Sequence, residues 1–203
     1  TITKTAVATG ADLVAYSGWS ASKYLEQPYN SDLDFGTGDF SVMWWVKTAD
    51  LYYTGVDRHQ ANEGFAVSTT GGSSLSCLRL TIGTAAINSS NAPIATNTWT
   101  QIVVLRRSAT SVEFYVNGKL WDTASIDSNL SASSPSGLPA KIGVRSDGAQ
   151  TLSGSMALFR ISATAPTAEQ IAKIYEDEKV LFQENAKATL YGTSDAVTAL
   201  AHD

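Results

Sequence analysis

The 203-residue sequence predicts an all-β fold, a sandwich of two antiparallel sheets, followed by one C-terminal α-helix. Three observations support this prediction. Up to about residue 162, apolar and polar residues alternate with a period of two in many short runs. Clusters of Gly, Ser, Thr, Asn and Asp separate these runs at the spacing that is typical of a sandwich. From Thr167 onward the apolar residues recur with the period of a helix.

At least eight runs have the pattern of a strand. The clearest is DFSVMWWVK at residues 39–47, in which both alternating sets of side chains are largely apolar. Both faces of this strand should therefore be buried. The other predicted strands are residues 22–27, 64–70, 77–83, 99–107, 112–116, 119–122, 140–146 and 154–162.

The sequence VEFYVNGKLWD at residues 112–122 predicts a β-hairpin. Asn117 and Gly118 both tolerate the positive φ that a two-residue type I′ turn requires. With this turn, Phe114 lies opposite Trp121 on an apolar face. We therefore expect Phe114 and Trp121 to form a cross-strand pair inside the sandwich, so that Trp121→Ala costs about 3–5 kcal/mol of stability.

A helix is predicted from about residue 168 to residue 187. Thr167 and Gln170 fit a capping box at its start. An apolar stripe follows at helical spacing, formed by Ile171, Ile174, Tyr175, Leu181 and Phe182. We accordingly divide the chain into a sandwich domain, residues 1–166, and a C-terminal helix and tail, residues 167–203.

The composition excludes several classes of function. Nineteen acidic and fourteen basic residues give a net charge of −5, and the largest basic cluster is Arg106-Arg107, so we expect no nucleic-acid partner. No run of eighteen apolar residues occurs, and we expect neither membrane insertion nor a signal peptide. The single cysteine, Cys77, excludes an internal disulfide. Because the sequence lacks an initiator Met, we expect it to be a piece of a larger polypeptide.

Four stretches resemble, in order and spacing, the laminin-G-like jelly rolls of the concanavalin A-like lectin/glucanase superfamily. They are YLEQPYNSDLDFGTGDFSVMWWVKT (24–48), WTQIVVLRR (99–107), VEFYVNGKLWD (112–122) and KIGVRSDGAQTLSGSMALFRISATAPTAEQI (141–171). The resemblance implies a two-sheet antiparallel jelly-roll sandwich (concanavalin A-like), with one curved sheet and loops gathered at the rims. Residues 167–201 additionally resemble a segment of bacteriophage tail and virion proteins.

The sequence does not predict an enzyme. A glucanase of this superfamily would carry two glutamates and an aspartate at alternate positions of one strand, so that the carboxylates project together into a cleft. No predicted strand carries such a set, and the acidic trio 176–178 lies on the predicted helix, where neighbouring side chains diverge by about 100°. His59 and His202 stand alone, so no serine triad or histidine metal cluster can be assembled.

Glycan binding is the function that the fold and the composition favour, because a sugar is held by an aromatic ring and by hydrogen bonds from polar side chains. Aromatic rings not assigned to the core are Tyr52, Tyr53 and Trp19. The segment TADLYYTGVDRHQANEG, residues 48–64, is interpreted as a rim loop, with an ordinary surface turn as the alternative. Together with a second loop around SDGAQ, it supplies the candidate ligand-binding residues Tyr52, Tyr53, Asp57, Arg58, His59, Asn62, Arg145 and Gln150.

Calcium is the candidate cofactor that the resemblance implies, since many members of this superfamily bind Ca²⁺ at the rim through oxygen ligands. Asp57 and Asp147 are the carboxylates that could converge on such an ion from two loops. However, Asp147-Gly148 after a serine is also the signal of a plain turn. The alternative is that the chain binds no cofactor.

Three hypotheses of different classes follow. In the first, the protein is a non-catalytic, lectin-like module on a phage tail or virion, facing the extracellular medium, that attaches to host surface polysaccharide. In the second, it is a structural decoration or assembly domain of a virion or adhesion protein without sugar binding. In the third, it is a hydrolase of surface glycan. The sequence does not identify the sugar, the host or the full-length protein.

The apolar stripe also predicts assembly, because it is longer than a sandwich needs to cover one edge. By analogy with fibrous phage proteins, we expect self-association through residues 167–201 as a homotrimer. Leu181 and Phe182 would then lie near the axis or against a neighbouring chain. The alternative is that both side chains pack on their own sandwich.

Overall fold

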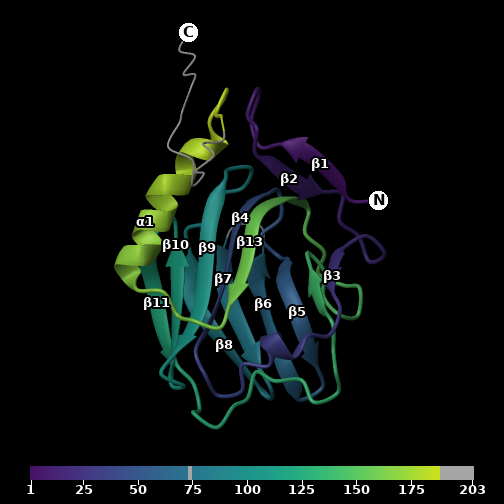
Figure 1. The fold of residues 1–203 in the computed structure, drawn as a ribbon, viewed down its shortest axis with the longest axis vertical. Helices are drawn as coiled ribbons and strands as arrows, with labels where there is room; N and C mark the ends of the chain where they lie inside the picture. Colours follow the sequence, from purple (N-terminus) through teal and green to yellow (C-terminus); the bar gives the residue numbers. More distant parts are fainter. Residues whose placement is uncertain (73–74, 188–203) are drawn as a thin grey trace, which may run out of the picture.

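The computed structural model describes residues 1–72 and 75–187, and two antiparallel sheets pack face to face in it, with a helix after the last strand (Figure 1). The predicted fold class is therefore confirmed. The seven-stranded sheet has the order β1 (Thr3–Ala6), β2 (Val14–Ser17), β13 (Gly154–Ser162), β4 (Phe40–Thr48), β9 (Thr100–Arg107), β10 (Ser111–Val116) and β11 (Lys119–Ser125). The six-stranded sheet has the order β3 (Leu25–Gln27), β12 (Ala140–Ile142), β5 (Thr54–Gln60), β6 (Glu63–Gly72), β7 (Leu75–Ile82) and β8 (Ala85–Ala92). The helical elements are η1 (Ser31–Leu33), α1 (Ala168–Lys179) and η2 (Val180–Phe182).

Four strands lie outside the predicted runs: β1, β2, β5 and β8. The most consequential is β5, because it occupies residues 54–60 of the segment that the sequence interpretation assigns to a rim loop. It pairs with β6, so its side chains alternate between the interior and the outer face of the sheet. The interpretation as a loop is wrong for these residues. The sequence TGVDRHQ lacks the alternation of apolar and polar residues that indicates a strand, because its outward residues are polar and one inward residue, Arg58, is charged.

The core fills the space between the two sheets. Phe40 and Trp44 of β4 point into it, as does Phe65 of β6, and none of the three is exposed. Burial of a side chain of this size contributes about 1.5–3 kcal/mol. Trp19, an exposed ring in the sequence interpretation, also belongs to this core, because its indole packs directly over Gly143.

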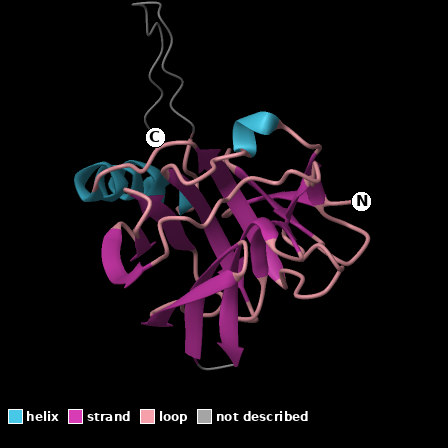
Figure 2. Cartoon of the chain, turned by 90° about the horizontal axis from the view of Figure 1, so that it is seen from below, coloured by secondary structure: helices cyan, strands magenta, loops and turns pink. Residues whose placement is uncertain are grey.

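The helix covers the outer face of the seven-stranded sheet (Figures 1 and 2). Trp45 of β4 points outward and stacks on Tyr175 and Phe182, with ring centroids 5.5 and 4.3 Å apart. Its Nε1 donates to the carboxylate of Glu178 at 2.7 Å. Ile171 is fully buried against the same sheet. The apolar face of α1 is therefore occupied by its own sandwich.

The start of α1 is as predicted, with a capping box between Thr167 and Gln170, but the helix ends at Lys179 and not near residue 187. The expectation that Phe182 faces a neighbouring chain is wrong, because η2 returns its ring to the sheet. Leu181 is half-buried. The rest of the predicted assembly segment, residues 188–201, lies outside the described residues, and the division of the chain at residue 166 stays a prediction. No helix in the described ranges is long and apolar enough to cross a bilayer.

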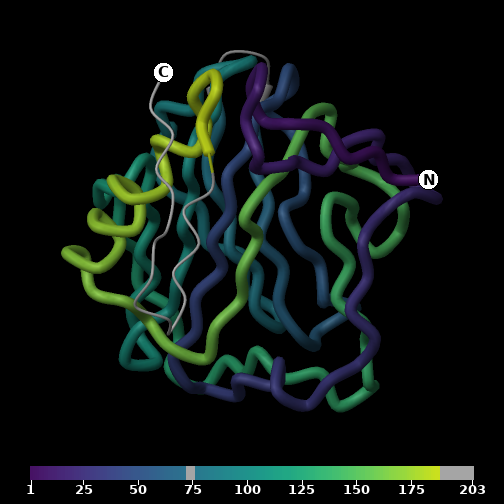
Figure 3. The backbone as a smooth tube through the Cα atoms, turned by 45° about the horizontal axis from the view of Figure 1, so that its top comes forward, coloured from purple at the N-terminus to yellow at the C-terminus, as the bar shows by residue number. Residues whose placement is uncertain are grey.

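The segment after η2 lies beside the turn between β1 and β2, at one end of the sandwich (Figure 3). Asn185 donates from its backbone N–H to the carbonyl of Thr9 at 2.7 Å, and Asp12 donates to the carbonyl of Ala186 at 3.0 Å. These bonds tie the segment after η2 to the turn between β1 and β2. The C-terminal segment is thus part of the folded unit up to at least Ala186.

The hairpin of β10 and β11 corrects the predicted position of Trp121. Asn117 and Gly118 form the expected turn with positive φ. The register, however, shifts next to Phe114, which pairs with Asp122, while Tyr115 pairs with Leu120. Trp121 is the extra residue of this bulge. It is 41% exposed and donates from Nε1 to the carbonyl of Ser90 at 3.3 Å, at the edge where the two sheets meet.

The corrected register predicts that truncation of Phe114 lowers the free energy of unfolding much more than truncation of Trp121. Phe114→Ala should lower the free energy of unfolding by about 3–5 kcal/mol, because the side chain is fully buried and its removal leaves a cavity. Trp121→Ala should cost about 1 kcal/mol or less, because the ring is largely at the surface. Urea denaturation of both variants measures these losses. Equal losses would contradict the register described above.

Candidate functional site

Two rows of outward side chains cross the six-stranded sheet, on the face that α1 does not cover. The pairing of β5, β6, β7 and β8 places each row in register. The first row consists of Thr54, Ser68, Arg79 and Asn88. The second consists of Asp57, Ala66, Thr81 and Ala86. Small and polar side chains alternate with charged ones, so this face is adapted to solvent or to a polar ligand.

A β-bulge at Gly55 determines which residues of β5 face outward. The register shifts between Thr54 and Val56, and the alternation of side chains reverses there. Tyr53 therefore points into the core and is fully buried, whereas Tyr52 is 45% exposed. Burial raises the pKa of the Tyr53 phenol. The prediction that Tyr53 binds a ligand is not compatible with this position.

The outer face is hollowed beside β5. A hollow of about 270 Å³ lies over the two rows and is closed at one side by the loop that follows β12. Its lining consists of Thr54, Asp57, His59, Ala66, Ser68, Arg79, Thr81, Ala86, Arg145 and Gln150. A second hollow, of about 320 Å³, shares Asp57 and His59 with the first and extends toward Leu138, Pro139 and Lys141. The two hollows are therefore neighbours that share Asp57 and His59.

Asp57 connects β5 to the loop after β12. It is 3% exposed, and both carboxylate oxygens accept backbone hydrogen bonds, from His59 at 2.7 Å and from Ser146 at 2.8 Å. A carboxylate held by two N–H donors is fixed in position. Asp57 therefore shapes the hollow by holding the loop against the strand.

His59 lies between the two hollows. Its Nε2 is 2.7 Å from the carbonyl oxygen of Gly83. Because a carbonyl only accepts, the hydrogen is assigned to Nε2, and in the neutral ring Nδ1 is then an acceptor. The ring is thus oriented by the turn between β7 and β8 and presents one acceptor to its surroundings.

The loop after β12 contributes Arg145 and Gln150. Arg145 donates from Nε and Nη2 to the two oxygens of Asp147 at 2.9 and 2.6 Å, and this ion pair lowers the pKa of Asp147 to about 2 and raises that of Arg145. Tyr52 and Asp57 lie close enough to contribute to the raised pKa of Arg145. Gln150 donates from Nε2 to the carbonyl of Thr69 at 2.6 Å. The loop is therefore rigidly attached at its polar side chains.

Arg79 was not among the predicted site residues, although it lines the hollow. Its side chain is half-buried, and its Nε is buried without a hydrogen-bond acceptor among the described residues. Thr54, 1% exposed, also lines the hollow, and its Oγ1 has no hydrogen-bond partner there. The sequence signal was an arginine between two apolar residues in CLRLTIG, where period-two alternation turns it away from the core.

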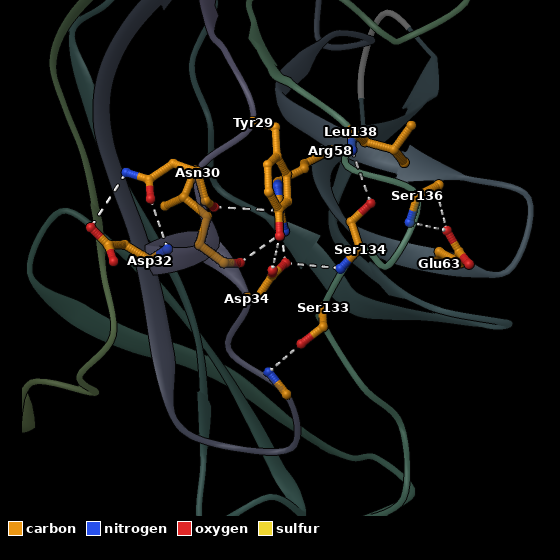
Figure 4. Close-up of polar contacts among 12 residues, drawn as sticks. Tyr29, Asn30, Asp32, Asp34, Arg58, Glu63, Ser133, Ser134, Ser136 and Leu138 are labelled. Carbon is orange, nitrogen blue, oxygen red and sulfur yellow. Dashed lines mark hydrogen bonds and ion pairs between the residues drawn. The ribbon is translucent and has the colours of Figure 1, made fainter.

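Arg58 points away from the hollow, into the rim of the sandwich (Figure 4). It is 1% exposed, and its guanidinium donates to Asp34 at 2.7 Å and to the carbonyl of Leu33 at 2.9 Å. The hydroxyl of Tyr29 donates to Asp34 at 2.8 Å, and its ring centroid lies 5.4 Å from the guanidinium. Arg58 is therefore a structural residue, since inward alternation on β5 places it in this network.

Four of the eight predicted ligand-binding residues line the hollow: Asp57, His59, Arg145 and Gln150. Tyr52 lines neither hollow, but it lies close enough to Arg145 to contribute to the raised pKa of that residue. The other three do not reach it. Tyr53 and Arg58 are buried, and Asn62 lies in the exposed turn between β5 and β6.

The residues predicted to hold calcium do not fit this ion. Ca²⁺ takes about six to eight oxygen ligands. Both oxygens of Asp57 already accept backbone N–H groups, and both oxygens of Asp147 accept from Arg145. In residues 1–72 and 75–187, no three side chains of the types His, Cys, Asp and Glu are grouped as a metal site would need. Asp57 and Asp147 therefore serve as anchors of the loop.

Comparison with known proteins identifies the family of the chain and solved structures of the same fold. Residues 20–172 match the family described as the concanavalin A-like lectin/glucanases superfamily. Among solved structures, the chain is similar to Domain 4 of AbnA, a GH43 extracellular arabinanase from Geobacillus stearothermophilus, in complex with arabinotriose. The identity is 17% and the TM-score 0.66, over 86% of this chain and 81% of that one. No curated protein matches.

Two further structures show the same fold. The binding domain of Paraclostridial Mosquitocidal Protein 1 is 16% identical, with a TM-score of 0.65 over 87% of this chain. The chain spans only 45% of the length of that structure. The native heptameric SAP-like pentraxin from Limulus polyphemus is 16% identical, with a TM-score of 0.62 over 79% of this chain and 80% of that one. At these identities the similarity concerns the fold alone.

The contacts of Asp34 with Arg58 predict that the stability lost in the variant Asp34→Asn depends on pH. Burial raises the pKa of Asp34, but hydrogen bonds from Ser134, Arg58 and Tyr29 outweigh it and leave the pKa below the ordinary value of 3.8. Asp34→Asn should lower stability by about 2 kcal/mol at pH 7, because buried Arg58 loses its counter-charge.

The pKa of Asp34 is lower in the folded chain than in the unfolded chain. The stabilisation that ionised Asp34 provides is therefore fully present above pH 3.8, and it is lost as the pH falls through the pKa of the folded state. Urea unfolding midpoints of both proteins at pH 7, 5 and 3 test the prediction. The difference between them should be similar at pH 7 and 5 and smaller at pH 3. A difference that grows toward pH 3 would contradict it.

Proposed function

The chain belongs to the concanavalin A-like lectin/glucanase superfamily, and on that premise we propose that it is a non-catalytic glycan-binding module whose ligand lies in the hollow on the outer face of β5–β8. The observation that carries the proposal is the convergence of polar groups from strands β5–β8 and one loop on this hollow, with an exposed ring, Tyr52, near Arg145 of the lining. Sugars are bound by this combination of an aromatic face and fixed polar groups.

The dimensions of the surface support an extended ligand. The hollows of about 270 and 320 Å³ are joined through Asp57 and His59. Each is at the lower end of the volumes of small-molecule sites, which are about 300–1,000 Å³. An oligosaccharide lying across both would contact more surface than a single sugar ring. The similar fold of the arabinanase domain, solved in complex with arabinotriose, supports the same ligand class.

The proposal that the module does not hydrolyse its ligand is supported by the chemistry of the lining. Glycoside hydrolysis commonly requires two carboxyl groups facing the scissile bond, one of them as acid. The described lining of the two hollows holds two carboxylates, Asp57 and Asp147. The first is saturated by backbone N–H groups and the second by Arg145. Neither is available as a proton donor or a nucleophile.

Tyr52 provides a specific test of the binding surface. Tyr52→Ala should weaken glycan binding by about tenfold, corresponding to the loss of one stacking ring. Its melting temperature should stay close to that of the unmodified chain, because Tyr52 is 45% exposed. A glycan array followed by calorimetry with the strongest oligosaccharide measures both affinities.

Tyr29→Ala is the matched control, because Tyr29 is 48% exposed but lies at the rim near Arg58, outside the lining of both hollows. This variant should retain full affinity. An equal loss in both variants would contradict the assignment of the site. Release of reducing ends in the same incubation would contradict the non-catalytic part of the proposal.

The proposal includes a biological setting, display on a phage tail or virion as a homotrimer that attaches to host surface polysaccharide. Its support is the resemblance of residues 167–201 to phage tail and virion proteins. An exposed apolar position adds to it: Val180, 46% exposed, lines a hollow with Leu181 and Ala186 after the helix. A second chain packed on this hollow would cover Val180.

Sedimentation tests the assembly with two forms of the protein. The intact chain should sediment as a trimer at micromolar concentration. A variant that ends at Lys187 keeps α1, η2 and the contacts of Phe182, and it should sediment as a folded monomer. A monomeric intact chain would contradict the trimer. Two trimeric forms would show that residues 188–203 are not required for assembly.

A further inference from the structure

We infer that the glycan is acidic and that Arg79 binds its anionic substituent, a carboxylate or a sulfate ester. This inference rests on the proposed function and narrows its ligand class. It is based on three properties of the hollow: the missing partner of Arg79, the space in front of its side chain, and the balance of charge in the lining. Each is independent of the similarity to other folds.

Arg79 differs from the other arginines of the chain. There are six arginines, and all lie in the described ranges. Five have an acceptor: Arg58 binds Asp34, Arg106 binds the carbonyl of Gly38, Arg107 binds Glu113, Arg145 binds Asp147 and Arg160 binds Glu178. For Arg79, no described residue accepts a hydrogen bond from Nε or forms an ion pair. Within the described ranges, Arg79 is therefore the arginine whose guanidinium lacks a protein acceptor.

Space for a ligand exists beside the guanidinium. Arg79 is opposite Ser68 on β6, and Ala66, Thr81 and Ala86 form the adjacent row. These small side chains leave the hollow of about 270 Å³ that Arg79 lines. Arg79 is half-buried, so part of its charge is removed from water without compensation from a protein acceptor. A ligand that supplied an anionic oxygen here would satisfy it.

A second unpartnered group lies in the same lining. The Oγ1 of Thr54, which is 1% exposed, has no hydrogen-bond partner among the described residues. Thr54 and Arg79 belong to one row, on either side of Ser68. A hydroxyl can donate and accept, so it suits a sugar hydroxyl next to the anionic group. Two groups without a hydrogen-bond partner among the described residues therefore lie in one row of the lining.

The charge balance of the lining favours an anion over a neutral sugar. Five charged side chains line the two hollows. Asp57 accepts from two backbone N–H groups, Arg145 and Asp147 form an ion pair, and Lys141 donates to the carbonyl of Ser146 at 3.0 Å, whereas the Nε of Arg79 has no acceptor among the described residues. The planar guanidinium fork matches the two coplanar oxygens of a carboxylate and also binds the oxygens of a sulfate ester. A neutral hydroxyl would leave the charge unpaired.

The experiment compares matched acidic and neutral glycans on the intact chain. The probes are oligogalacturonate and its methyl ester, sialyllactose and lactose, and sulfated and desulfated galactan oligosaccharides. Affinities are measured by calorimetry at low and high salt. The acidic member of at least one pair should bind about tenfold more tightly or better than its neutral partner, and the difference should shrink with salt. The pair that shows the preference distinguishes carboxylate from sulfate.

Three variants assign the preference to the residue. Arg79→Gln should reduce the acidic-to-neutral ratio to about one. Arg79→Lys keeps the charge but loses the planar fork, so it should retain part of the ratio. Arg160→Gln is the control, because Arg160 lies on β13 of the other sheet and binds Glu178. Its ratio should equal that of the unmodified chain, and circular dichroism verifies that all variants are folded.

Each outcome supports or contradicts a defined statement. Equal affinities for the acidic and neutral members of every pair would overturn the inference but leave the proposed glycan-binding function intact. A preference that survives in Arg79→Gln would overturn the role of Arg79. Absence of binding to all six glycans, followed by absence of binding on a broad glycan array, would overturn both the inference and the proposed function.

Discussion

The close approach of β5 to Trp44 is the constraint on which the proposed binding surface depends. At Gly55 a Cβ atom would lie 3.1 Å from the indole ring of Trp44, so a side chain at this position would be tightly packed against the core tryptophan. The bulge occurs at this position. It turns Tyr53 into the core and leaves Tyr52 and Thr54 outside. A strand without the bulge would present the opposite set of side chains and bury a different aromatic ring.

The two sheets differ in what covers their outer faces. On the seven-stranded sheet, Met43, Trp45 and Val103 form an apolar outer surface, and α1 covers it through Ile171 and Tyr175. On the six-stranded sheet the outward rows are small and polar, and the helix is on the opposite side of the molecule. Helix α1 therefore covers the face whose apolar surface must be removed from water. The polar face is left available for a ligand.

The sequence predicted the fold well because the signals of the fold are local. Period-two alternation in β4, the Asn117-Gly118 turn and the Thr167 capping box each depend on a few neighbouring residues. The position of Trp121 could not be predicted in this way. A bulge beside Phe114 changes the pairing by one residue, and nothing in the local sequence specifies where that extra residue falls.

The candidate site was predicted only in part for the same reason. Asp57 and His59 lie two residues apart on β5. Because side chains alternate along a strand, both point to the same face of the sheet. Arg58 between them is inward, and the loop interpretation missed this because it ignored alternation. Arg79 comes from a different strand, and its unpaired state depends on contacts with β6 and β8 that only the folded chain reveals.

The central claim is that the open face of the six-stranded sheet binds the ligand. Chemical-shift mapping of the isotope-labelled chain tests it most directly, by titration with an oligosaccharide that binds on an array. The account predicts that backbone amide signals of Thr54, Arg79 and Arg145 shift in a saturable manner while those of α1 stay unchanged. Saturable shifts confined to α1, or to the rim around Tyr29, with none on β5–β7, would contradict it.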